Sequence, residues 1–196
     1  MIGIDEVGRG PLAGPVVVTV LALWESIDLS KSGLPLRDSK KLTERERTAW
    51  RAWIGSRPEI MHATAYVYPK AIDRLNISRA ANLAAYRAYK RLIAALSLPP
   101  KAKSYQLEAI LDGGLHLPKH IPHQTIVKAD ERFPAVSLAS IIAKTSRDEA
   151  MRRLSCAFPA YGFEEHKGYG TAAHMKALRK HGACEHHRLT FIRNIV

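Results

Sequence analysis

Short apolar runs separated by turn residues predict the β-strands of this chain. The clearest run is residues 16–23, where valine and leucine dominate, and β-branched residues of this kind favour a buried strand. Residues 1–6 predict a second strand, which should pair with 16–23 through the glycine-rich connection between them. Alternation of apolar and polar residues predicts a third at 62–68. The remaining predicted strands, each running towards an aspartate, are residues 105–111 and 124–128.

Helical periodicity predicts four helices, at residues 43–53, 78–96, 136–154 and 171–181. Thr43 should cap the first, with acidic residues in the first turn where the helix dipole favours them. Ser78 should cap the second, which Pro99 and Pro100 terminate, and Gly182 should stop the last. Strands first, followed by alternating helices and strands, predict a mixed α/β sandwich around a central sheet.

The length of the chain fits one domain spanning residues 1–196. Its longest apolar run is far shorter than the roughly 18 residues that a membrane span needs, and the first residues form a strand rather than a secretory signal. Two cysteines, Cys156 and Cys184, are too few to staple a fold of this size and indicate reduced thiols. We therefore expect a cytoplasmic protein without membrane contact.

The charge of the chain indicates its class of partner. Thirty lysines and arginines against eighteen aspartates and glutamates give a net charge of +12. A basic excess of this size favours a polyanion, because each neutralised phosphate releases condensed counterions. Charge alone does not separate nucleic acid from an anionic membrane, but it favours nucleic acid.

A glycine-rich turn follows the first predicted strand. Gly8, Gly10 and Gly14 nearly match the fingerprint of a dinucleotide-binding fold. That fold requires the turn to open a helix whose N-terminus meets the pyrophosphate. Here Pro11 and Pro15 flank the turn and a strand follows it, so we reject a dinucleotide site.

Carboxylates stand where the strands end. Asp5 and Glu6 close the first strand, Asp112 precedes two glycines, and Asp130 follows another apolar run. A single aspartate in such a place is usually a turn residue, but four in a basic chain favour a shared role. Phosphodiester cleavage by two divalent cations needs converging carboxylate oxygens, with the metals roughly 3.5–4 Å apart. Alternation would point Asp5 and Glu6 to opposite faces, so both can serve only if the strand ends there.

Longer motifs, in order along nearly the whole chain, resemble those of the ribonuclease HII family (type 2 ribonuclease H). The matching segments are 3–14 (GIDEVGRGPLAG), 38–42 (DSKKL), 111–113 (LDG), 127–130 (VKAD), 137–144 (SLASIIAK) with Arg147 and Asp148, 161–163 (YGF), 166–171 (HKGYGT) and 185–188 (EHHR). The chain departs from the usual pattern at Gly114, where asparagine is common, and at Leu189-Thr190, where arginine-serine is common.

The resemblance implies a ribonuclease H-like fold, with a five-stranded mixed sheet flanked by helices. It implies metal ligands at Asp5, Glu6, Asp112 and Asp130. It also implies that the backbone of Gly8, Arg9 and Gly10 grips the ribonucleotide 2′-hydroxyl and neighbouring phosphates, and that Tyr169 packs against the sugar after the cut. Five further residues suit phosphate contacts: Lys40, Lys41, His166, Lys167 and Arg188. Asp148 lies within a helix and should be a structural charge partner.

The implied activity is endonucleolytic cleavage of the RNA strand of RNA–DNA hybrids and incision 5′ to single ribonucleotides in duplex DNA. Two Mg²⁺ or Mn²⁺ ions would support in-line attack of water, leaving a 3′-hydroxyl and a 5′-phosphate. One ion would be held by Asp5 and Asp130, the other by Asp5, Glu6 and Asp112. The implied role is RNA primer removal and ribonucleotide excision in replication and repair. We expect a monomer, and no clamp-binding motif is evident.

Three alternatives compete with this interpretation. A structural zinc site would require pairs of close ligands, usually with several cysteines. Neither candidate group has such pairs. The two groups are His116, His120 and His123, and His181, Cys184, His186 and His187. A non-catalytic nucleic-acid binder would not need four carboxylates near phosphates. Ribonuclease HIII carries an extra N-terminal domain and a different glycine loop, and is disfavoured.

Overall fold

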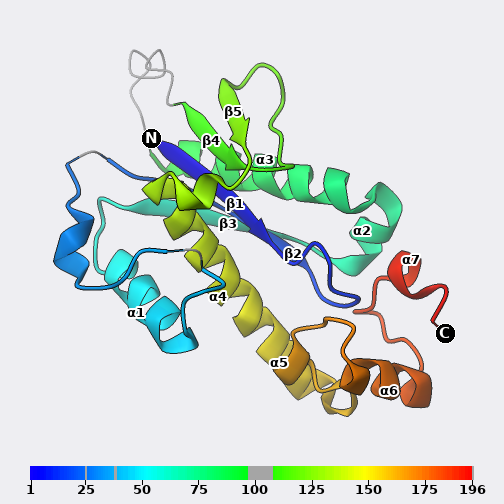
Figure 1. The fold of residues 1–196 in the computed structure, drawn as a ribbon. Helices are drawn as coiled ribbons and strands as arrows, with labels where there is room; N and C mark the ends of the chain where they lie inside the picture. The colour runs from blue at the N-terminus through cyan, green and yellow to red at the C-terminus, as the bar shows by residue number, and fades with distance from the viewer. Residues whose placement is uncertain (25, 38, 97–107, 196) are drawn as a thin grey trace.

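A five-stranded mixed sheet forms the centre of the molecule (Figure 1). The structure is a computed structural model that describes residues 1–24, 26–37, 39–96 and 108–195. The strands are β1 (Ile2–Val7), β2 (Val16–Ala22), β3 (Met61–Val67), β4 (Ala109–Asp112) and β5 (His123–Ile126), in the order β3-β2-β1-β4-β5. The pairs β1–β2 and β2–β3 are antiparallel, whereas β1–β4 and β4–β5 are parallel.

Helices cover both faces of this sheet. The helices are α1 (Glu44–Gly55), α2 (Pro69–Leu75), α3 (Ile77–Ala95), α4 (Pro134–Ala157), α5 (Phe163–His166), α6 (Ala172–His181) and α7 (Leu189–Ile192), with 3₁₀ turns η1 (Leu29–Ser32), η3 (Ala129–Glu131) and η4 (Pro159–Tyr161). In Figure 1, α4 crosses the front of the sheet with α1 beside it, and α3 lies behind. None of the helices in the described ranges is both long and apolar enough to cross a membrane.

The two faces of the sheet have different cores. Small alanines of α3 pack on β1 and β2 residues such as Ile4 and Val18, which brings the helix close to the sheet. On the other face, Leu21 packs with Trp50 of α1 and Leu138 of α4. At Gly3, an added Cβ would lie 2.2 Å from the Ala135 carbonyl carbon, so only glycine allows α4 to approach β1 this closely.

The predicted elements are confirmed where the structure describes them, apart from one cap. Thr43 caps α1 in a capping box with Glu46, and Thr171 and Gly182 bound α6. The second helix begins earlier than predicted, because Asn76 caps it by accepting from the Arg79 amide. The assignment of Ser78 as that cap is therefore wrong. Residues 105–107 of one predicted strand, and the prolines at 99 and 100, lie outside the described residues. The short helices α2, α5 and α7 were not predicted.

Candidate active site

The ends of β1 and β4 bring two of the predicted carboxylates to one rim of the sheet. The strands are parallel, with Ile4 paired to Leu111, so Asp5 and Asp112 follow at the same level. Open α/β sheets place ligands at the carboxyl ends of their strands. The start of β2 and the end of β3 meet at the same rim, because both pairings there are antiparallel.

Asp5 is buried against α4. Its side chain is 5% exposed, its Oδ1 accepts from the Glu6 amide at 2.7 Å, and the Ser140 hydroxyl hydrogen-bonds to it. Ser140 in turn bonds to Ser39 Oγ at 2.7 Å. Burial, and next the charge of Glu6, raise the pKa of Asp5 well above its usual value. The two serines were present in the matching motifs but were not predicted to contact Asp5.

Glu6 lies within a continuing strand, because β1 does not end at Asp5 but runs on to Val7. The Glu6 carboxylate is approached by Arg9 Nη1 at 3.5 Å, and Arg9 also reaches Ser78 at the start of α3. Burial raises the pKa of Glu6 to about 7; the Arg9 charge opposes this shift and the Asp112 charge adds to it. Asp112 also contributes to the raised pKa of Asp5. The strand therefore does not end where the sequence analysis required it to end, yet the charges of Glu6 and Asp112 both act on Asp5, so the three acids form one electrostatic group.

Asp112 and Asp130 belong to neighbouring segments. Asp112 Oδ1 accepts from the Ala129 amide at 2.8 Å, which fixes η3 beside the end of β4. Asp130 follows in η3 and lines a small hollow with Arg37 and Ser137.

The carboxylates do not form a closed metal cage as they stand. In the part of the chain that the structure describes, no three Asp, Glu, His or Cys side chains lie close enough to enclose an ion. Coordination therefore requires these side chains to turn towards one another. The chemistry of the group nevertheless fits a divalent cation. Glu6 Oε2 is buried without a hydrogen-bond partner among the described residues, two carboxylates are held at raised pKa, and all the donors are oxygens, as hard cations prefer.

The glycine-rich turn between β1 and β2 lies directly beside this group; we call residues 8–15 the glycine loop. Gly8 has φ +90°, and a Cβ there would lie 2.2 Å from Arg147 Nε, so no other residue fits. Gly10 is exposed, and a Cβ on it would lie 3.9 Å from Tyr169 Cε1. Acids, glycine loop and tyrosine therefore adjoin one another.

A family model of ribonuclease HII matches residues 2–194 of the chain. The chain belongs to the ribonuclease HII family. It is therefore a type 2 ribonuclease H, an endoribonuclease that cleaves the RNA strand of RNA–DNA hybrids and depends on divalent metal. The predictions of family and enzyme class are confirmed.

Individual members of the family are similar to this chain in sequence and in structure. The ribonuclease HII of Chlamydia caviae is 43% identical over 196 residues, which cover 99% of this chain and 85% of the relative. Among solved structures, the ribonuclease HII of Archaeoglobus fulgidus, solved in complex with PCNA, has a TM-score of 0.72 at 26% identity and covers 96% of this chain and 93% of that one. Ribonuclease H2 of Pyrococcus horikoshii OT3 has a TM-score of 0.66 at 24% identity over 99% and 95% of the two chains. These likenesses confirm the predicted ribonuclease H-like fold.

Two of the basic residues proposed to touch phosphates are buried in this ribonuclease HII chain. Arg188 is 0% exposed, and its guanidinium donates to the carbonyls of Gly8, Arg9 and Gly14. His166 is 8% exposed and bonds to the Tyr161 carbonyl at 2.8 Å. Direct phosphate contact by these two side chains is therefore not supported. They support the loops that carry the proposed substrate contacts.

Tyr169 projects from the loop between α5 and α6 and is 46% exposed. Its amide donates to the His166 carbonyl at 2.9 Å, and its carbonyl bonds to His174 Nδ1 at 3.0 Å. His174 Nε2 lies 3.1 Å from His187 Nε2. The cluster His166, His174 and His187 is therefore a support for the Tyr169 loop. It includes one histidine of the second zinc candidate, and burial lowers the pKa of His187 to about 4.

The remaining basic candidates differ in their surroundings. Lys40 and Lys41 are exposed and follow Ser39, which is hydrogen-bonded to Ser140 beside Asp5. They therefore lie on the same side of the sheet as Asp5. Lys167 is half-buried, and its ammonium group donates to the Glu164 carbonyl at 2.5 Å. Asp148 bonds to Lys144 at 2.6 Å and lies 4.0 Å from Arg47, which confirms its prediction as a structural charge partner.

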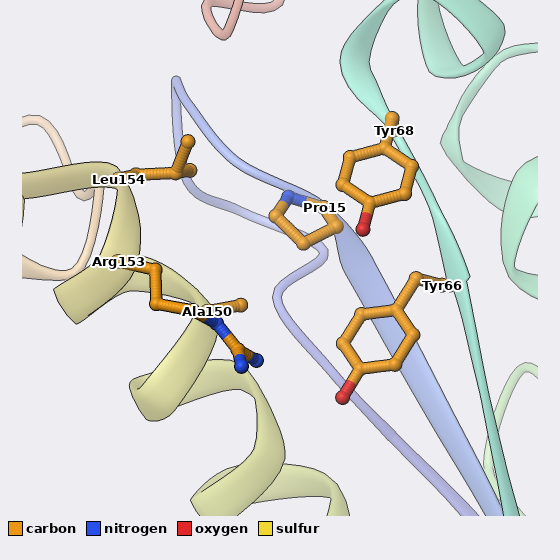
Figure 2. Close-up of a pocket in the computed structure, with 6 residues that line it drawn as sticks. All are labelled: Pro15, Tyr66, Tyr68, Ala150, Arg153 and Leu154. Atoms are coloured by element: carbon orange, nitrogen blue, oxygen red, sulfur yellow. The ribbon is translucent and has the colours of Figure 1, made fainter. Parts of the chain in front are cut away.

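The rim also has a hollow of about 310 Å³ beyond the end of the glycine loop (Figure 2). Tyr66 and Tyr68, stacked with ring centroids 6.4 Å apart, stand on one side of it, and Arg153 of α4 stands on the other. The hollow contains none of the four predicted carboxylates. Its lining therefore adds aromatic and basic side chains to this rim of the sheet.

Proposed function

We propose that this ribonuclease HII chain also incises duplex DNA on the 5′ side of a single embedded ribonucleotide, leaving a 3′-hydroxyl and a 5′-phosphate. The observation that carries the proposal is the adjacency of the buried Asp5 and the half-buried Glu6 to the glycine loop and Tyr169. The loop and the aromatic ring offer contacts for one sugar, and the 2′-hydroxyl is the group that separates RNA from DNA at one step.

Asp5, Glu6, Asp112 and Asp130 would hold two divalent cations, Mg²⁺ or Mn²⁺. When bound, such cations neutralise the acids, polarise the phosphate and its attacking water, and stabilise charge on the departing 3′-oxygen. The chain itself positions the acids: Ser140 and the Glu6 amide hold Asp5, and the Ala129 amide holds Asp112. The main chain of Gly8, Arg9 and Gly10 would bind the ribose 2′-hydroxyl.

The surroundings of the site suit a nucleic-acid duplex. Lys40, Lys41 and Lys167 would contact phosphates as point charges, and Arg9 would add a further contact beside Glu6. A net charge of +12 supports binding along the backbone. We further propose that residues 1–196 act as one domain and as a monomer in the cytoplasm, in primer removal and ribonucleotide excision.

The deciding experiment compares two duplexes of the same sequence, one with a single ribonucleotide in DNA and one with an all-RNA strand paired to DNA. We expect Mg²⁺- or Mn²⁺-dependent cutting of both, with one incision 5′ to the lone ribonucleotide. Mapping the product ends on a denaturing gel shows the position, and phosphatase treatment shows the 5′-phosphate. Cutting of only the all-RNA strand would contradict the proposal.

Tyr169 provides a separate prediction. Tyr169→Ala should lower kcat/KM on the single-ribonucleotide duplex by roughly 5- to 160-fold, because one aromatic stacking contact is worth about 1–3 kcal/mol. Tyr169→Phe keeps the ring and should stay within about threefold of wild type, since the loss of one exposed hydroxyl costs little. Steady-state kinetics on both variants checks this. Equal losses in the two variants would show that the hydroxyl, not the ring, matters.

A further inference from the structure

Arg188 places a buried cation beneath the glycine loop. Its Nη2 donates to the Gly8 carbonyl at 2.6 Å, and its Nη1 donates to the Arg9 carbonyl at 2.8 Å. Its Nε and Nη2 donate to the Gly14 carbonyl at 3.1 and 3.0 Å. One planar guanidinium thus holds three carbonyls from both ends of the loop. A lysine ammonium, as a single point donor group, does not have this forked geometry.

A second buried guanidinium lies against the same loop. Arg147 of α4 is 1% exposed and donates to the Pro15 carbonyl at 3.0 Å and to the Ala13 carbonyl at 3.2 Å. Burial and the neighbouring Arg147 charge lower the pKa of Arg188 to about 9. Burying two like charges costs free energy. Packing alone therefore does not account for two arginines under one short turn.

The captured carbonyls determine where the next amides point. The structure contains no cis peptide, and in a trans peptide the carbonyl and the following N–H point in opposite directions. Because the Gly8 and Arg9 carbonyls face Arg188 inside the protein, the N–H groups of Arg9 and Gly10 face outwards. Neither N–H has an acceptor among the residues that the structure describes. The outer side at Gly10 adjoins the Tyr169 ring.

We propose that Arg188, supported by Arg147, is a positioning residue that aims the Arg9 and Gly10 amides at the substrate sugar and so sets selectivity for ribonucleotide over deoxyribonucleotide. The inference rests on the proposed function of the glycine loop as the reader of the 2′-hydroxyl. Arg188 acts through the backbone and does not touch the substrate. The backbone around Arg188 also pairs with the glycine loop: the Arg188 amide donates to the Leu12 carbonyl, and Ala13 pairs with His187.

The test measures binding rather than cutting. Full-length protein carrying Asp5→Asn, which blocks cleavage, is titrated in Mg²⁺ with two fluorescent DNA duplexes that differ only in one ribonucleotide. The readout is the Kd for the all-DNA duplex divided by the Kd for the duplex with one ribonucleotide. We expect Arg188→Lys to lower this ratio roughly fivefold, the value of about one hydrogen bond, with little change in affinity for the all-DNA duplex. Arg147→Lys, whose carbonyl contacts lie later in the loop, should have a smaller effect.

Two controls separate positioning from simple destabilisation. Arg179→Lys changes an exposed arginine on α6 and should leave the ratio unchanged. Leu92→Ala opens a cavity in the α3 core, lowers stability and should also keep the ratio. The inference is overturned if the parent protein prefers the ribonucleotide-containing duplex and Arg188→Lys keeps that preference. It is also overturned if Leu92→Ala removes the preference to the same extent as Arg188→Lys. If the parent protein binds both duplexes equally, the glycine loop does not read the 2′-hydroxyl. In that case the proposed function of the loop fails, and the inference about Arg188 fails with it.

Discussion

Replacing Asp5 by asparagine should reduce the rate of RNA cleavage on the order of a thousandfold or more, because metal-assisted stabilisation is worth several kcal/mol. Asparagine keeps the size of the side chain and an oxygen that can accept from the Glu6 amide, but it carries no charge to bind a cation. The loss should appear in kcat, measured under single-turnover conditions in Mg²⁺ with an RNA–DNA hybrid. The protein should stay folded, since the change removes repulsion from Glu6 and Asp112.

Asp148 offers a matched control for this substitution. It is also a buried aspartate, but it pairs with Lys144 and Arg47 inside the helix layer rather than with other acids. Asp148→Asn should lower the melting temperature, because it leaves two cations without their partner, and should change the cleavage rate only a few-fold. If the two variants showed the opposite pattern, with Asp148→Asn inactive and Asp5→Asn active, the assignment of the catalytic acids would be wrong.

Local signals in the sequence predicted the strands of the sheet well. A valine-rich run such as 16–23 has few alternatives to a buried strand, and Thr43 with Glu46 forms a cap from residues three apart. Asn76 was missed because it serves two helices at once: it ends α2 and begins α3 with φ +66°. That conformation, which asparagine tolerates better than most residues, depends on the packing of both helices.

Contacts between residues far apart in the sequence explain why Arg188 and His166 were wrongly predicted to touch phosphates. Arg188 is polar and follows a histidine-rich motif, so sequence alone suggests a surface cation. Its burial results from the pairing of residues 186–188 with the glycine loop, about 174 positions earlier in the chain. His166 is buried for a related reason, since its ring stacks on His174, 4.3 Å away between centroids. Neither contact leaves a periodic signal in the sequence.

Glu6 should contribute less stability to the metal-free protein as the pH rises from about 4.5 to 7. Its folded pKa is raised from 4.5 to about 7, so the folded state binds the proton more tightly than the unfolded state. The stabilisation from this proton is fully present below about pH 4.5 and is lost as the pH passes 7; a shift of this size corresponds to about 3 kcal/mol. Urea unfolding of wild type and of Glu6→Gln in EDTA, at pH 5 and pH 8, measures it.

Glu6→Gln isolates this contribution from the other titrating groups. Burial of His187 lowers its pKa to about 4, which gives stability that increases with pH and opposes the Glu6 effect. Both proteins carry that histidine, so the difference between wild type and Glu6→Gln cancels it. The variant should lose less stability than wild type between pH 5 and pH 8. Mg²⁺ or Mn²⁺ should stabilise wild type more at pH 8 than at pH 5, because cations bind the ionised carboxylates, and should stabilise Glu6→Gln less. Equal pH dependence in the two proteins would show that Glu6 titrates normally in the folded state.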